Sequence, residues 1–144
     1  MKERDYIKLE FTSRTTTPIS VCENAMVAFT EQLKPTPDEL GDIKTAISEA
    51  VANAINHAYP DKSGKILVRA ATYDDNTLIM KVQDWGRGIA NVKKAREPFF
   101  TQSSDNNHSG IGFTIMESCM DTVTVKSTLG EGTTVTMSKK LGAK

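Results

Sequence analysis

The sequence has no net charge, few cysteines and no long apolar run, and each absence removes a class of protein. Its 18 basic and 18 acidic residues cancel, which removes the usual electrostatic argument for binding nucleic acid or a membrane surface. Two cysteines in 144 residues make neither a disulfide scaffold nor a metal-ligand pattern. No segment approaches the ~20 apolar residues of a membrane span, and no apolar stretch follows the charged N-terminus. We therefore expect a cytoplasmic protein that contacts neither nucleic acid nor membrane directly.

Length and periodicity predict a single domain of the α+β class. A chain of 144 residues is the size of one domain, so we expect residues 1–144 to form one unit. Apolar periodicity predicts strands at 6–12, 65–73, 77–83, 122–128 and 133–138, and helices at 18–33, 37–57, 91–96 and 110–120. Because hairpins outnumber crossovers, we expect a two-layer sandwich, with helices covering one face of a mixed, mostly antiparallel sheet.

Two of the predicted helices begin with capping residues, and one polar segment shows no pattern of a helix or a strand. Thr17 before Pro18 is predicted to cap the first helix. Thr36 followed three residues later by Glu39 predicts a capping box at the second. Residues 101–109 are almost entirely polar, which predicts a mobile loop.

Asp84 follows a predicted strand and precedes Gly86 and Gly88. A carboxylate in that position can accept a hydrogen bond from an exocyclic amine such as that of adenine. The glycines would let the backbone approach a ligand closely. Taken alone, such an acid is more often an ordinary turn residue.

A second glycine pair, Gly110 and Gly112, opens a predicted helix. Backbone N–H groups at that end of a helix dipole bind phosphate groups. A lone Gly-x-Gly is a weak signal. The polar loop in front of it, which could close over phosphates as a lid, makes the signal stronger.

Glu49 and Asn53 share one flank of the long second helix, beside its apolar face. The Asn53 side chain could complete a Mg²⁺ shell together with phosphate oxygens. Glu49 could act as a general base toward a hydroxyl or a water. In isolation both are better read as solvated helix residues. Thr133 offers a hydroxyl at the start of the last strand, which is a weak signal by itself.

Three segments together resemble the ATP site of the Bergerat-fold superfamily, which histidine kinases, gyrase-type ATPases and anti-sigma kinases share. They are residues 49–53 (EAVAN), 84–88 (DWGRG) and 109–113 (SGIGF). With residues 47–55, 97–101 (EPFFT) and 109–117 (SGIGFTIME), the chain resembles the sporulation anti-sigma-F factors from about residue 7 to about residue 139.

This resemblance implies a serine kinase that uses ATP, yields ADP and requires Mg²⁺. Glu49 would be the base, Asn53 the Mg²⁺ ligand and Asp84 the adenine acceptor. Further nucleotide contacts are implied for Gly86, Gly88, Ser109, Gly110, Gly112 and Thr133. The resemblance also implies a homodimer that holds a sporulation sigma factor and phosphorylates a serine of an anti-anti-sigma protein.

The sequence departs from the family pattern at three places. His108 stands where the family tends to carry a basic residue, and Ala58 stands where glycine is common. Cys22 and Glu23 occupy the part of the first helix where the family uses a basic residue for partner contact.

Two other functions fit the same motifs. One is an anti-sigma kinase of the general stress response, which differs only in its partners. The other is an ATP-gated sigma-binding protein with little catalysis. A histidine kinase fragment fits less well because the chain has no helical dimerisation segment, and a gyrase-like ATPase would need a following domain.

Overall fold

The computed structural model describes residues 1–97 and 111–142. Its elements are β1 (Glu3–Thr12), α1 (Thr17–Thr30), the 3₁₀ turn η1 (Glu31–Leu33), α2 (Pro37–His57), β2 (Lys65–Tyr73), β3 (Thr77–Asp84), α3 (Val92–Ala95), α4 (Gly112–Cys119), β4 (Thr122–Thr128) and β5 (Gly132–Lys140). His108, Ser109, Gly110 and the loop expected at 101–109 lie outside the described residues.

Five strands form one sheet in the order β1-β2-β3-β5-β4. Every neighbouring pair among them is antiparallel. The α+β class and the two-layer sandwich are confirmed. The expected mixed sheet is corrected, because every strand pair in the described residues is antiparallel.

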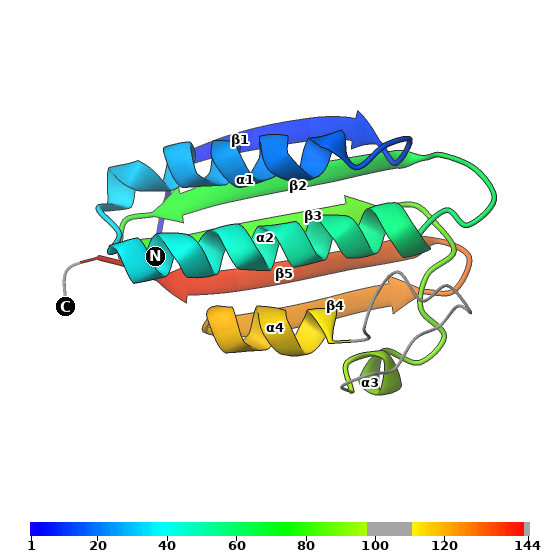
Figure 1. Cartoon of the computed structure of the whole chain (residues 1–144). Coiled ribbons are helices and arrows are strands. Elements are labelled where there is room, and N and C mark those ends of the chain that lie inside the picture. The colour runs from blue at the N-terminus through cyan, green and yellow to red at the C-terminus, as the bar shows by residue number, and fades with distance from the viewer. Residues whose placement is uncertain (98–110, 143–144) are drawn as a thin grey trace.

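The connections explain why no parallel pair forms. Between β1 and β2 the chain passes through two long helices that run in opposite directions (Figure 1), so it returns to the end of the sheet that it left. Before β4, helix α4 runs back along the sheet (Figure 1), so β4 runs in the same direction as β3. The hairpin partner β5 lies between these two strands and is antiparallel to both.

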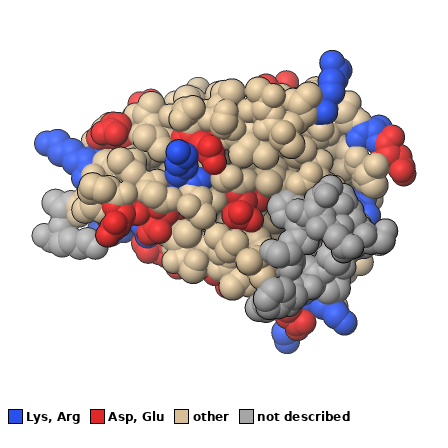
Figure 2. Space-filling model, in the orientation of Figure 1, with Lys and Arg blue, Asp and Glu red and all other residues tan. Residues whose placement is uncertain are grey.

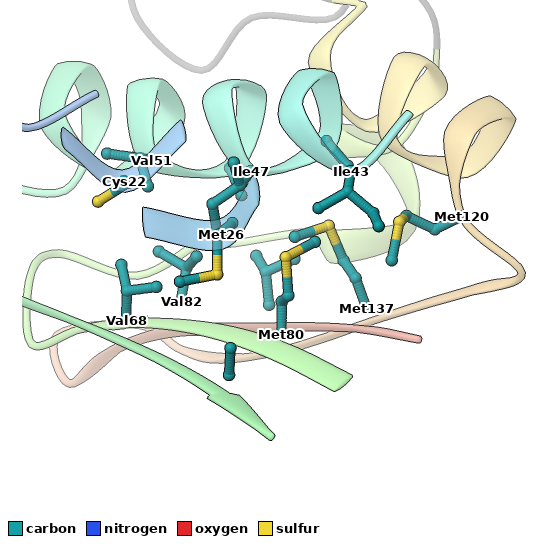
Figure 3. Close-up of a cluster of buried hydrophobic side chains, with 14 of the residues drawn as sticks. Cys22, Met26, Ile43, Ile47, Val51, Val68, Met80, Val82, Met120 and Met137 are labelled. Atoms are coloured by element: carbon teal, nitrogen blue, oxygen red, sulfur yellow. The ribbon is translucent and has the colours of Figure 1, made fainter. Parts of the chain in front are cut away.

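The helices α1, α2 and α4 lie together on one face of the sheet (Figure 1), and the core fills the space between the layers. Alternate strand residues point into it, as the period of two requires: Ile66, Val68, Ala70, Leu78, Met80, Val82, Val135 and Met137. Figure 3 shows Met26 of α1 in one cluster of buried side chains with Met80 and Met137 of the sheet. The flexible thioether chains fill the irregular space where helices cross strands. Within the described parts of the chain, no helix is long and apolar enough to cross a membrane.

The start of α2 confirms the predicted capping box. The Thr36 N–H donates to Glu39 Oε1 at 2.8 Å, and the Glu39 N–H donates to Thr36 Oγ1 at 3.2 Å. The prediction for α1 was wrong by one residue: Thr16 is the N-cap, and its side chain makes no cap hydrogen bond. Pro18 already fixes the backbone of the first turn, so this helix starts without a side-chain cap.

Candidate active site

The flank of α2 that carries Glu49 and Asn53 faces the start of α4. A Cβ added to Gly112 would stand 3.0 Å from Asn53 Nδ2 and 3.3 Å from Glu49 Oε1. Any side chain larger than the hydrogen of glycine at position 112 would therefore displace Glu49 and Asn53, which are half-buried between the helices. The structure thus brings together three residues that the sequence placed in two separate motifs.

Asp84 lies at the end of β3 and is 8% exposed. Its Oδ1 accepts hydrogen bonds from the backbone N–H of Gly86 at 3.0 Å and of Thr133 at 3.2 Å. Across residues 1–97 and 111–142, no donor reaches the other carboxylate oxygen, Oδ2. Burial raises the pKa of the Asp84 carboxyl, and the two N–H donors partly offset that rise. One oxygen therefore holds the carboxyl in place while the other remains available to a ligand.

Gly86 and Gly88 allow the segment after β3 to run against its neighbours. A Cβ on Gly86 would stand 2.1 Å from the Ala58 carbonyl oxygen, which also accepts the Arg87 N–H at 2.8 Å. Gly88 has a φ of +75°, and a Cβ there would meet the Thr128 carbonyl oxygen at 2.3 Å. The segment is thereby fixed between the end of α2 and the β4–β5 hairpin.

Ala58, where glycine is common in the family, has ordinary right-handed helical angles, φ −70° and ψ −37°. Glycine is required there only if the chain must leave α2 through a left-handed conformation. This departure from the pattern therefore leaves the loop undisturbed.

Thr133, on β5, lies beside Asp84, which ends β3. The Thr133 hydroxyl oxygen is 2.8 Å from that of Ser127 on β4. Ser127 Oγ also accepts the Ile89 N–H at 2.7 Å. Sequence reasoning missed Ser127. The signal available was its register, because Ser127 pairs with Thr133 across the final hairpin.

Tyr59 is a second residue that the sequence did not single out. Its hydroxyl accepts the Trp85 N–H at 2.8 Å and donates to the Lys65 carbonyl oxygen at 2.6 Å. The Lys65 ammonium lies 4.4 Å from the centre of the Trp85 ring. These contacts hold the residue next to Asp84 against the start of β2.

The site therefore has two ends, joined by α2. At one end, a buried carboxylate with a free oxygen and a hydroxyl pair can recognise a flat polar group. At the other, the start of a helix lies against an acid and an amide, a combination that suits phosphate and a divalent cation. Outside the grey residues, the face shown in Figure 2 carries acidic and basic side chains without a large patch of one sign.

Comparison with known proteins identifies the family to which the chain belongs. Residues 13–139 match the family model of the histidine kinase-like ATPase domain. The anti-sigma F factor of Caldanaerobacter subterraneus is 43% identical over 99% of this chain and 98% of its own length. That of Pasteuria penetrans is 44% identical over 98% of this chain and 94% of its own.

Among solved structures, the RsbU and RsbW domains of a Mycobacterium tuberculosis protein superpose with a TM-score of 0.70 at 20% identity. The match covers 98% of this chain and 34% of that one. The histidine kinase domain of an Erythrobacter litoralis blue-light activated kinase gives a TM-score of 0.57 at 20% identity, over 85% and 61% of the two chains. These structures share the fold, and the resemblance found in the sequence is confirmed: the chain belongs to the anti-sigma F factors, within the histidine kinase-like ATPase domains.

Proposed function

We propose that this chain is an ATP-dependent anti-sigma kinase that binds a sigma factor and phosphorylates a serine of an anti-anti-sigma protein. The names of its relatives support the sigma factor as partner, and the matching ATPase family supports the nucleotide. The observation that carries the proposal is the contact of Gly112, at the start of α4, with Asn53 and Glu49 on α2.

The Asp84 end of the site fits an adenine ring. Since Oδ1 is occupied by two backbone donors, Oδ2 can accept the exocyclic amine of the base. Gly86 and Gly88 keep side chains away from the segment that the base would approach. The Thr133 hydroxyl lies beside the same carboxylate and supplies a second polar group.

The Gly112 end fits phosphates and Mg²⁺. The first N–H groups of α4 have no partner within the helix, and the helix dipole favours negative charge there. The Asn53 amide oxygen is a suitable Mg²⁺ ligand. We propose that Ser109 and Gly110, which belong to the same motif, add contacts to the phosphates.

Bound Mg-ATP would supply the phosphoryl group. Glu49 would accept the proton of the serine hydroxyl as its oxygen attacks. Asn53 and the N–H groups of α4 would keep the phosphates in line and offset their charge. The contribution of the protein is then mainly positioning and charge stabilisation, as in other phosphoryl transfers.

The wider setting of this activity also belongs to the proposal. We propose one domain over residues 1–144 that forms a homodimer in the cytoplasm and acts on a sporulation sigma factor. The resemblance implies these statements, and the names of the relatives support the sigma factor as partner.

The test is phosphotransfer to the anti-anti-sigma protein from the same organism, with Mg-ATP, read by intact mass. We expect one added phosphate, located on serine by fragmentation. In Glu49→Gln the phosphate should disappear while the ATP affinity stays within about twofold, because an uncharged isostere still fills the same space. Glu10→Gln, which removes an exposed glutamate on β1, is the matched control and should transfer normally.

Asn53→Ala separates the metal role from the base role. Its remaining transfer should require a higher Mg²⁺ concentration, whereas added Mg²⁺ should not bring back any transfer in Glu49→Gln. Unchanged transfer by both variants would contradict the assignments. A wild-type protein that binds the sigma factor only with ATP, yet adds no phosphate to the antagonist, would instead be an ATP-gated binder.

A further inference from the structure

We propose that Ser127 is a positioning residue that makes the Thr133 hydroxyl donate toward the N1 atom of adenine and so contributes to base selectivity. The inference rests on the proposed ATP site. It concerns a residue that touches no nucleotide itself and acts through its neighbour.

The geometry joins three segments of the chain at one hydroxyl. Ser127 Oγ accepts the Ile89 N–H at 2.7 Å, which ties the segment after β3 to β4. The same oxygen lies 3.1 Å from the Gly132 carbonyl oxygen and 2.8 Å from Thr133 Oγ1. Thr133 in turn donates its N–H to Asp84 Oδ1. The hydroxyl pair and the carboxylate are therefore held in one fixed arrangement.

Counting hydrogens shows that this arrangement has two states. Ser127 has one hydroxyl hydrogen and two acceptors for it, Gly132 O and Thr133 Oγ1. If Ser127 donates to Gly132 O, Thr133 must donate to Ser127 to keep their bond, and Thr133 then offers only lone pairs to a ligand. If Ser127 donates to Thr133, the Thr133 hydrogen is released to point at a ligand.

The two states suit different purines. Adenine presents an amine donor beside the acceptor N1, whereas guanine presents the acceptor O6 beside the donor N1–H. Asp84 Oδ2 matches the adenine amine, and a donating Thr133 matches adenine N1. Binding of adenine would therefore select the state in which Ser127 donates to Thr133. Without Ser127, the Thr133 hydroxyl is no longer directed and can accept as readily as it donates.

The test compares ATP with the ATP analogue in which C–H replaces N1, using calorimetry on the full chain. For the wild type, we expect the analogue to bind roughly fivefold more weakly, the effect of losing one neutral hydrogen bond. In Ser127→Ala this ratio should fall to about two to three, with ATP itself weakened and the analogue almost unchanged, because an undirected Thr133 hydroxyl donates only part of the time. Ser127→Thr keeps the hydroxyl and should restore the ratio.

Ser138→Ala is the matched control. It removes the other hydroxyl pair of the same β4–β5 ladder, between Thr122 and Ser138, at the end away from Asp84. Its ratio should equal that of the wild type. If Ser127 were only structural, Ser127→Ala would weaken both nucleotides equally and leave the ratio unchanged, which would overturn the inference but not the proposed function. A wild-type chain that binds no ATP would overturn both.

Discussion

Gly112 at the start of α4 lies against Asn53 of α2, so closely that a methyl group on Gly112 would stand 3.0 Å from Nδ2 and 3.2 Å from Oδ1 of the amide. Such distances are tighter than ordinary packing. Glu49 Oε1 would be 3.3 Å away from the same methyl group. The proposed metal ligand and the proposed base therefore both depend on the absence of one side chain from another helix.

Gly112→Ala should separate stability from activity. Gly112 has no positive φ, so alanine fits the helical backbone and should change the free energy of unfolding by no more than about 1 kcal/mol. The new methyl group displaces Asn53 and Glu49 by a few tenths of an ångström, which should lower phosphotransfer on the order of 10-fold, less than the effect of a 1 Å misplacement. Urea unfolding and the rate of phosphate transfer measure the two effects.

The control for this variant is Gly41→Ala on the same helix as Asn53. A Cβ at Gly41 meets nothing within 4 Å. Because Gly41 lies inside α2, alanine there should raise the free energy of unfolding by up to about 1 kcal/mol, without any loss of rate. If Gly112→Ala transferred phosphate as fast as Gly41→Ala, the contact between Gly112 and the α2 side chains would have no part in catalysis.

Asp84→Asn should weaken ATP binding strongly and leave the fold intact. The asparagine oxygen can still accept the Gly86 and Thr133 N–H groups, but an NH₂ group replaces Oδ2 and opposes the adenine amine. Losing a charged hydrogen bond and leaving a donor without a partner should weaken ATP binding at least about 100-fold. The melting temperature should stay the same or rise, because the folded protein no longer buries a charge.

The pH dependence of wild-type binding follows from the same residue. Burial raises the Asp84 pKa in the folded state, so the folded protein holds this proton more tightly than the unfolded chain does. The cost of the buried charge is absent below the unfolded pKa and is complete once the pH has passed the folded pKa. ATP needs the ionised form, so its affinity should fall as the pH drops through the raised pKa. In Asp84→Asn, neither the ATP affinity measured by calorimetry nor the stability measured by thermal melting should show this pH dependence.

Much of the fold could be predicted because its signals are local. The capping box at Thr36 and Glu39 and the alternation along β2 and β3 fix element boundaries within a few residues of the chain. The strand order could not be predicted in the same way. It depends on α1 and α2 returning the chain to one end of the sheet, and on β5 entering between β3 and β4.

The residues of the candidate site also fall into those with a local sequence signal and those without one. Glu49, Asn53, Asp84 and Gly112 stand in short motifs and could be named from the sequence. Ser127 and Tyr59 take their positions from partners 38 and 26 residues away, Ile89 and Trp85. A hydroxyl whose partner lies that far along the chain has no local pattern, so only the strand register and the loop contacts could show it.

Glu39 should stabilise the fold beyond its role in the cap. It is 8% exposed, and Oε1 accepts both the Thr36 N–H at 2.8 Å and the Gly142 N–H at 3.1 Å. Thr36→Ala removes only the cap, at a cost of about 1 kcal/mol. Glu39→Ala also leaves the buried Gly142 N–H without this acceptor, which should raise the loss to about 2–3 kcal/mol. Urea unfolding of the two variants gives the difference.

Glu39→Gln tests whether the acceptor or the charge matters. The glutamine oxygen can still accept both N–H groups, so this variant should lose less stability than Glu39→Ala. Equal losses in Thr36→Ala and Glu39→Ala would mean that the link to Gly142 adds nothing. ATP affinity should be unchanged in all three, because the cap lies at the end of α2 away from Asp84.

Cys22 should report how α1 opens. It is 1% exposed, and burial, together with the nearby Glu23 carboxylate, raises its pKa to about 11. At pH 8 only about one thiol in a thousand would be the reactive thiolate, so iodoacetamide should leave Cys22 unmodified in the folded protein and alkylate it in urea. Peptide mass spectrometry distinguishes it from Cys119, and Cys22→Ala confirms the assignment.

The effect of ATP on this reaction decides which motion exposes Cys22. A ligand at 100 times its dissociation constant stabilises the folded state by about 2.7 kcal/mol, which slows any modification that requires global unfolding about 100-fold. If alkylation of Cys22 slows by that factor, α1 is released only when the whole domain unfolds. If ATP leaves the rate unchanged, α1 separates from α2 while the nucleotide site stays folded, because Asp84 and Gly112 lie on other elements.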